Sequence, residues 1–252
     1  MSAMFREIKA TRIGKKTFEL DEKIVNDEEV EVIVNEMAFG RFSVSPNFLK
    51  EFAVGYLMGE GLIDSMDNIK NIELNENIIK VEIDLVDFDI RRDMVMSSDC
   101  FGGWRSRIEF VKEVKSDYTI SKDQILDAFD RLRKESTVWK ETGGTHIAAI
   151  VTEDIFIAIE DVSRHVAIDK VMGAAVLKGI DLSRSFIACS GRMPSDMVMK
   201  VARVGIPILT SKAAPTASGF MAGEKSGVTI VGFVRGGRFN LYTHPNRISL
   251  DG

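Results

Sequence analysis

The first third of the chain alternates apolar and polar residues in short runs. Residues 29–34 have the period of a half-buried strand, and Lys70 to Leu85 predict two further strands on either side of the turn residues Asn75-Glu76-Asn77. This part of the chain is therefore expected to form a small sheet.

A helix is predicted between these strands. Ser45 followed by Pro46 fits an N-cap and a first-turn proline, and Gly59 and Gly61 fit the end of the helix. The apolar face of this helix consists of Phe48, Leu49, Phe52, Leu57 and Met58. Strands and helix together predict a small mixed domain.

From Thr145 onward, apolar strands alternate with helical segments. The predicted strands are 147–151, 155–159, 186–189, 207–211, 228–234 and 239–243, and the predicted helices are 164–178, 195–204 and 216–225. This order of elements predicts a layered α/β domain, in which ligands gather beyond the carboxyl ends of the strands. The polar loops at those ends are residues 160–162, 190–192, 214–216 and 235–238.

A further helix is predicted to begin at Ser121, because Ser121 and Gln124 have the spacing of a capping box. We therefore divide the chain into a mixed α/β domain over residues 1–120 and an α/β domain over residues 121–252. The predicted fold class is α/β, or α+β for the chain as a whole.

Composition narrows the classes of function. With 252 residues and 45% hydrophobic content, the chain can bury one large core or two modest ones, and its net charge of −5 argues against broad nucleic-acid binding. The chain shows no signal-like apolar stretch near its start and no run of about 18 apolar residues, so we expect neither export nor membrane insertion. A cytoplasmic protein with reduced thiols is predicted.

The two cysteines stand in different surroundings. Cys100 lies among small and polar residues, where a thiol is accessible to chemistry. Cys189 ends an apolar run and is expected to be a small buried hydrophobe. Gly103 stands where a redox or metal motif would carry a second cysteine, so Cys100 has to act with one sulfur.

An arginine-glycine segment lies between the last two predicted strands. In the segment Arg235-Gly236-Gly237-Arg238, two glycines allow a ligand to approach the backbone, and two guanidinium groups suit an anion such as phosphate. The same spacing also fits a hairpin turn with two solvated arginines.

Three other polar segments leave binding and structural interpretations open. Ser190-Gly191-Arg192 fits either a phosphate site at a helix start or a capped helix, and Thr142 to His146 fits either a turn that approaches a ligand or a linker. His165 and Asp169 share a helical face, where the histidine either bonds Asp169 or contacts a ligand.

Several motifs in this order resemble the formate dehydrogenase accessory sulfurtransferase family, also called the FdhD/NarQ family. The matching segments are residues 46–63, the Cys100 loop, 143–146, 160–165 with Asp169-Lys170, 190–192, 205–208, 214–216 and 232–245. The similarity runs over nearly the whole chain.

This resemblance implies a sulfur carrier that formate dehydrogenase requires. Such a protein receives sulfur as a cysteine persulfide from a cysteine desulfurase and passes it to the bis(molybdopterin guanine dinucleotide) form of the molybdenum cofactor, or to a tungsten counterpart. The carrier cysteine maps onto Cys100, and the cofactor-binding stretch maps onto Phe233, Val234, Arg235, Gly236, Gly237 and Arg238. The resemblance also implies a homodimer, no permanently bound cofactor, and a second domain with the three-layer α/β/α fold of cytidine deaminases.

One departure from the family pattern keeps an alternative open. Many members carry Cys-x-x-Cys in the carrier loop, whereas this chain has Cys100 and Gly103. The alternatives are a cofactor chaperone that binds without moving sulfur, and a regulatory nucleotide-binding module. A zinc-dependent deaminase is not expected, because the helix starts at residues 163–167 and 193–197 lack the thiol pair that would hold the metal.

Overall fold

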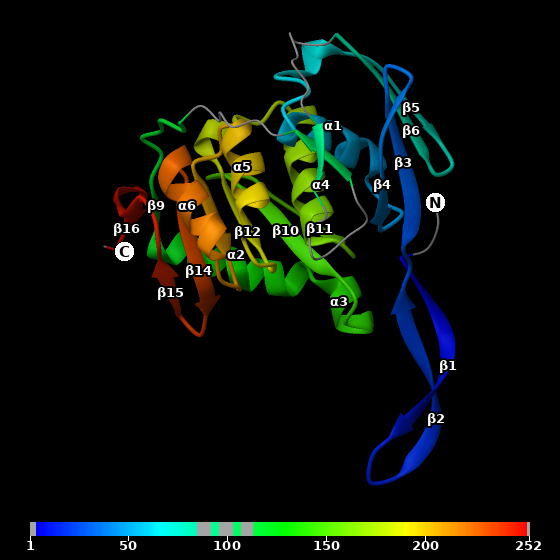
Figure 1. The fold of residues 1–252 in the computed structure, drawn as a ribbon. Coiled ribbons are helices and arrows are strands. Elements are labelled where there is room, and N and C mark those ends of the chain that lie inside the picture. The colour runs from blue at the N-terminus through cyan, green and yellow to red at the C-terminus, as the bar shows by residue number, and fades with distance from the viewer. Residues whose placement is uncertain (1–3, 85–91, 96–102, 107–112, 251–252) are drawn as a thin grey trace.

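The computed structural model describes residues 4–84 and 113–250, together with the backbone of residues 92–95 and 103–106. A six-stranded mixed sheet forms the centre of the second half (Figure 1). Its strands are, in spatial order, β11 (Phe156–Asp161), β10 (His146–Val151), β12 (Phe186–Cys189), β13 (Ile208–Ser211), β14 (Thr229–Arg235) and β15 (Arg238–Leu241).

The strand directions bring four carboxyl ends to one edge of this sheet. β12, β13 and β14 are parallel, and β10 is antiparallel to both β11 and β12. β11 therefore runs in the same direction as β12. The loops that follow β11, β12, β13 and β14 consequently leave the sheet at the same edge.

Helices cover both faces of the sheet (Figure 1). The helices α4 (Arg164–Leu177), α5 (Ser195–Arg203) and α6 (Ala217–Ser226) lie on one face, and α2 (Lys122–Glu135) lies on the other. Along β10, Ala148 and Ile150 pack with the first group, whereas Ile147 and Ala149 pack with α2. Apolar side chains thus point to both faces, and the predicted mixed α/β fold class is confirmed.

A four-stranded sheet and one helix form the first half. The strands are, in spatial order, β4 (Met37–Val44), β3 (Glu28–Val34), β6 (Ile78–Ile83) and β5 (Ile69–Asn75), and α1 (Leu49–Gly59) packs against them. The strands predicted within residues 29–34 and 70–85 correspond to β3, β5 and β6, although Leu85 lies outside the described residues.

The predicted start of α1 is wrong. The N-cap residue is Phe48, not Ser45. Ser45 is buried and bonds to the second half: its backbone amide donates to Asp161 Oδ2 at 3.0 Å, and its hydroxyl accepts from the Val162 amide at 3.2 Å. Because Ser45 holds these long-range partners, it cannot cap the adjacent helix.

The two halves meet where α1 crosses α4. Gly55 of α1 and Gly173 of α4 face each other, and a Cβ added at either position would overlap a backbone carbonyl of the opposite helix. Only glycine permits so close an approach of two helix backbones.

A buried ion pair lies beside this crossing. Lys170 Nζ is 2.6 Å from Asp161 Oδ2 and also donates to the Ser45 carbonyl at 2.9 Å and to Asn47 Oδ1 at 3.0 Å. Asp161 accepts further bonds from the amides of Ser45 and Ser163, and both charged side chains are 0% exposed. The charges are thus surrounded by hydrogen-bonding partners from both halves.

A two-stranded hairpin projects from the body of the molecule (Figure 1). It consists of β1 (Phe5–Ile13) and β2 (Thr17–Val25), and its base contacts the short helix α3 (Thr137–Thr142) through a 2.6 Å ion pair between Lys23 and Glu141. The sequence pattern predicted neither this hairpin nor α3.

The connection between the halves packs against the second half. The amide of Val114 donates to the Ser226 carbonyl at 2.8 Å, and Arg247 donates to the carbonyls of Val114 and Ser116. The division of the chain at residue 120 stays a prediction.

The remaining elements are short. They are the strands β7 (Arg92–Val95), β8 (Gly103–Ser106), β9 (Ile120–Ser121) and β16 (Ile248–Ser249), and the 3-10 turns η1 (Met66–Asn68), η2 (Leu182–Arg184) and η3 (Pro245–Arg247). Within the described ranges, no helix has the length and apolar character needed to cross a membrane.

Candidate functional site

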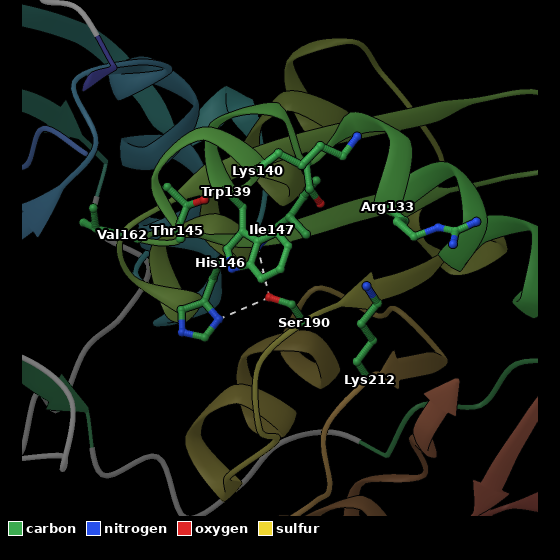
Figure 2. Close-up of a pocket in the computed structure, with 12 residues that line it drawn as sticks. Arg133, Trp139, Lys140, Thr145, His146, Ile147, Val162, Ser190 and Lys212 are labelled. Atoms are coloured by element: carbon green, nitrogen blue, oxygen red, sulfur yellow. Dashed lines mark hydrogen bonds between the residues drawn. The ribbon is translucent and has the colours of Figure 1, made fainter. Parts of the chain in front are cut away.

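The carboxyl edge of the six-stranded sheet carries a pocket of about 450 Å³ (Figure 2). Its described lining comes from α2, α3, the start of β10 and the loops that follow β11, β12 and β13. The lining residues are Arg133, Ser136, Trp139, Lys140, Gly143, Gly144, Thr145, His146, Ile147, Val162, Ser190 and Lys212. Of the predicted ligand-approaching segments, 143–146 and Ser190 therefore meet in one cavity.

The charged residues that line this pocket are positive. Arg133, Lys140 and Lys212 line it, and none of the described lining residues is acidic. Burial lowers the pKa of Lys212, and the nearby Arg133 lowers that pKa further, whereas the carboxylate of Asp130 opposes the shift. The pocket is thus suited to an anion.

His146 is held by the loop that follows β12. Its Nδ1 lies 3.1 Å from the hydroxyl of Ser190, which also accepts from the Ile147 amide at 3.1 Å (Figure 2). Burial lowers the pKa of His146, and the charge of Arg192 lowers it further. The imidazole is therefore neutral at pH 7 and can exchange hydrogen bonds with a ligand without adding charge.

Two arginines approach each other on the α4 side of the same edge. Arg164 is the first residue of α4, and burial and then the charge of Arg192 lower its pKa. A Cβ added at Gly191 would lie 2.8 Å from Cβ and Cδ of Arg164, so the glycine leaves room for the aliphatic part of this side chain. Two neighbouring guanidinium groups at a helix start add to the positive potential of the edge.

The partners of His165 and Asp169 differ from the predicted pair. Asp169 lies 2.8 Å from Lys200 Nζ, and His165 Nε2 lies 3.8 Å from Asp196 Oδ2 on α5. Both side chains are directed toward α5, because α4 and α5 lie on the same face of the sheet.

The predicted cofactor-binding stretch forms the end of β14 and its turn into β15. Gly236 and Gly237 have φ angles of 60° and 73°, which is the left-handed backbone of a tight hairpin, and Arg235 and Arg238 are exposed on either side. Phe233 has a φ of 55° where the register with β15 shifts, and Val234 is 1% exposed. The hairpin interpretation of the spacing is thus correct, and cofactor binding by the same residues remains a prediction.

The structure describes one of the two cysteines, Cys189. Cys189 is 2% exposed, and burial raises the pKa of its thiol to about 11, so it is the small buried residue that was predicted. Cys100 falls in the segment between β7 and β8, outside the described residues.

Sequence reasoning did not single out the pocket residues of α2 and α3 or Lys212, and it gave Glu160 no role at this pocket. Arg133, Trp139 and Lys212 line it, and the carboxylate of Glu160 bonds the backbone of α3 beside it. No periodic pattern marks a six-residue helix, so Trp139 had no predicted element. The signal in the sequence for Glu160 was its place in the polar loop 160–162, at the carboxyl end of a predicted strand.

The chain has relatives over nearly its full length. The model of the FdhD/NarQ family matches residues 25–249. A protein of Methanothermobacter thermautotrophicus named sulfur carrier protein FdhD is 53% identical over 98% of this chain and 99% of its own length. A Bacillus pumilus protein of the same name is 36% identical, with 97% of each chain covered.

The fold has a solved counterpart. The crystal structure of a formate dehydrogenase accessory protein from Desulfotalea psychrophila matches with a TM-score of 0.81 and 26% identity, over 98% of this chain and 100% of that one. Family model, relatives and fold agree over most of the chain, and the chain therefore belongs to the FdhD/NarQ family.

Proposed function

We propose that this protein carries sulfur to the bis(molybdopterin guanine dinucleotide) cofactor, or its tungsten counterpart, on behalf of a formate dehydrogenase. Cys100 accepts a persulfide sulfur from a cysteine desulfurase in the cytoplasm. The relatives named sulfur carrier proteins support the sulfur-carrying role, and the transfer to the cofactor is our proposal.

The transfer step needs one thiol. The bond between the two sulfur atoms of the Cys100 persulfide breaks, and its electron pair leaves with Cys100 as a thiolate. The outer sulfur arrives without that pair, so the acceptor supplies two electrons and is oxidised. Cys100 is then ready to accept a new sulfur.

The positive edge of the sheet is the observation that carries the proposal. Pyrophosphate groups make the guanine dinucleotide cofactor strongly anionic, and the exposed Arg235 and Arg238 stand at the edge that also holds Lys212 and Arg133. Guanidinium groups pair with phosphate oxygens in bidentate geometry. We infer that the 233–238 hairpin binds the cofactor while Cys100 delivers sulfur.

The first test is intact-protein mass spectrometry after incubation with a cysteine desulfurase and cysteine. The wild type should gain one reducible sulfur, Cys100→Ala should gain none, and Cys189→Ala should behave like the wild type. A gain that persists in Cys100→Ala and disappears in Cys189→Ala would overturn the assignment of the carrier thiol.

A cofactor chaperone is the second candidate, and Gly103 is the observation that favours it. Without a second cysteine in the loop, the chain lacks a thiol that relatives with Cys-x-x-Cys have for receiving or releasing sulfur. A chaperone carrying Cys100→Ala should still activate formate dehydrogenase, whereas a sulfur carrier with that change should not.

The hairpin is tested separately by direct binding. We expect Arg235→Ala with Arg238→Ala to weaken the affinity for GDP, used as a probe of the cofactor's nucleotide, by about tenfold or more, because each charge-assisted contact to phosphate is worth about 1.5–3 kcal/mol. Unchanged affinity would remove the hairpin from the binding site.

A further inference from the structure

The strand β11 is an edge strand whose outer side lacks the usual protection. It stands at one end of the six-stranded sheet and pairs with β10 in an unbroken antiparallel register (Figure 1). Its residues 156–159 include no charged residue and no proline. An apolar edge of this kind can pair with a strand of another chain, and proteins normally protect it.

The other edges of the two large sheets carry such protection. The edge strands β15, β4 and β5 each pair with their neighbour through a register that shifts. They also carry exposed charged side chains, which are Arg238 on β15, Arg41 on β4, and Lys70 and Glu73 on β5. A register shift and a charge both oppose the addition of a further strand. Among the edges that the structure describes in these two sheets, β11 is therefore the exception.

The backbone of β11 presents hydrogen-bonding groups on its outer side. The Thr152 amide donates to the Ile155 carbonyl at 2.9 Å, so these two residues form a hydrogen-bonded pair of the β10–β11 hairpin. Such pairs alternate along an antiparallel ladder, and Phe156 and Ala158 consequently direct their N–H and C=O groups away from β10. No residue within the described ranges bonds these outward groups. They are available to a strand that lies alongside.

A groove of about 400 Å³ follows this edge. Residues 156–159 form its floor, α2 forms one wall, and the start of α1 with the end of α4 forms the other. On the α2 wall, the guanidinium of Arg131 lies 4.1 Å from the centre of the Phe156 ring. The apolar side chains of the opposite wall are Phe48, Ala174 and Leu177. An added strand would thus meet a polar wall on one face and apolar contacts on the other.

Phe48 places an aromatic ring at this groove at a cost in stability. It is the N-cap of α1, with φ 52° and ψ 41°, and it is 47% exposed. Bulky residues avoid this left-handed region, and Phe48 gives the helix no side-chain cap bond. Asparagine would suit both the backbone and the cap. An exposed ring that is kept at such a position is suited to contact a partner.

The charge of the groove selects the kind of partner. Four carboxylates lie in the groove or in the exposed turn before β11. They are Glu51, Glu135, Glu153 and Asp154. Two cations, Arg131 and Lys178, line the same groove. The carboxylates outnumber the cations, so the edge favours a segment with basic side chains.

Open backbone groups, apolar contacts and acidic charge together match an extended basic peptide. We propose that β11 is a docking edge for a partner protein, which adds an extended segment to the six-stranded sheet. Alternate apolar side chains of that segment contact Phe48 and Leu177, and lysine or arginine side chains between them face Glu135. Backbone pairing supplies affinity, and the two walls supply specificity. This surface requires neither the cofactor nor Cys100, so it goes beyond the proposed function.

Amide hydrogen exchange of the full chain, followed by NMR, tests whether the edge is open. The amides of Phe156 and Ala158 should exchange rapidly, whereas those of Ile157 and Ile159, which face β10, should be protected. Protection of Phe156 and Ala158 that decreases on dilution would assign the edge to a second copy of the chain. Protection that is independent of concentration would show that the chain covers its own edge. Either result would overturn the proposal.

A short peptide that alternates valine and lysine is the probe for docking. It should bind saturably in calorimetry and protect the amides of Phe156 and Ala158 from exchange. A peptide that alternates valine and glutamate should bind about tenfold more weakly or less, because its carboxylates meet those of the groove. If the valine-lysine peptide protects neither amide, β11 is not a docking edge.

Methylation of the peptide nitrogens separates strand addition from charge attraction. Alternate residues of an added strand direct their N–H groups to β11 and to solvent. We therefore use two versions of the peptide, one methylated at every valine nitrogen and one at every lysine nitrogen. One version should lose affinity by about tenfold or more, and the other should bind nearly as well as the unmodified peptide. An equal effect of both methylations would rule out strand pairing.

Two variants test the walls of the groove. Phe48→Asn should leave the fold at least as stable and weaken peptide binding about fivefold, because the aromatic contact is lost. Glu135→Lys should weaken binding about two- to fivefold. Its matched control is Asp127→Lys, since Asp127 is exposed on the same helix and does not line the groove. Equal weakening by the two charge reversals would mean that the peptide responds to net charge, and the placement at β11 would be wrong.

Discussion

Asp161 and Lys170 are the residues on which the contact between the two halves depends most directly. Burial raises the pKa of Asp161, although the ammonium of Lys170 and the amides of Ser163 and Ser45 oppose that rise. Burial likewise lowers the pKa of Lys170, although the negative charge of Asp161 opposes this decrease. Each charge is tolerated in the interior because the other is present.

Asp161→Ala should therefore be severely destabilising. It leaves the ammonium of Lys170 buried without its carboxylate, and we expect the free energy of unfolding to fall by about 3–5 kcal/mol in urea denaturation. The control is Asp21→Asn in the exposed pair with Lys9, whose side chains are 63% and 76% exposed; this change should cost about 1 kcal/mol at most. Equal effects for the two variants would contradict this account.

Cys189 should be protected from alkylation in the folded protein. With a thiol pKa of about 11, only about one molecule in 3,000 carries the thiolate at pH 7.5. In Cys100→Ala, iodoacetamide should label Cys189 only after denaturation. Any residual labelling of the native protein should become about tenfold faster with each unit by which the pH is raised, up to about pH 10. Rapid native labelling at pH 7.5 would show that Cys189 is accessible.

At the scale of elements, the α1–α4 crossing depends on the absence of side chains. Gly173→Ala raises intrinsic helix propensity by about 1 kcal/mol, yet the added methyl group meets the Glu51 carbonyl of α1. We expect the free energy of unfolding to fall by about 2 kcal/mol or more, because two rigid backbones must separate. Gly14→Ala, where the nearest described atom is 3.8 Å from the added Cβ, should be close to neutral in the same denaturation experiment.

The elements that could be predicted from the sequence are those with a strong local signal. The capping box of Ser121 and Gln124 forms as expected, with bonds of 2.8 and 3.1 Å, and α2 follows it. The apolar strands of the second half also lie close to their predicted ranges, because short apolar runs rich in β-branched residues and bounded by polar or turn residues favour strands over helices.

The elements that could not be predicted depend on partners distant in sequence. The sequence places Ser45 where an N-cap is expected, but in the structure Ser45 forms hydrogen bonds with Asp161 and Val162. The hairpin of β1 and β2 carries polar residues on most positions and so has no core-facing pattern. The pocket likewise depends on α3, which is fixed by Glu160 rather than by its own sequence.

For the whole molecule, these contacts predict a single cooperative unfolding transition. The buried pair and the helix crossing join the two halves, so the unfolding of one half exposes buried groups of the other and lowers its stability. In Trp104→Phe, urea unfolding followed by far-ultraviolet circular dichroism and by Trp139 fluorescence should have coincident midpoints. Two separated transitions would show that the halves are independent.

The crossing of α1 and α4 also implies an order in which the two halves fold during protein synthesis. Because chains generally fold from the N-terminus as they are made, α1 and the sheet of β3 to β6 can be complete before α4 leaves the ribosome. The later helix then docks on an existing template. A second half produced as a separate fragment would leave Lys170 without Ser45 and Asn47 and would expose the groove at Gly173 to chaperones and proteases. Supplying the first half in the same cell should restore its solubility.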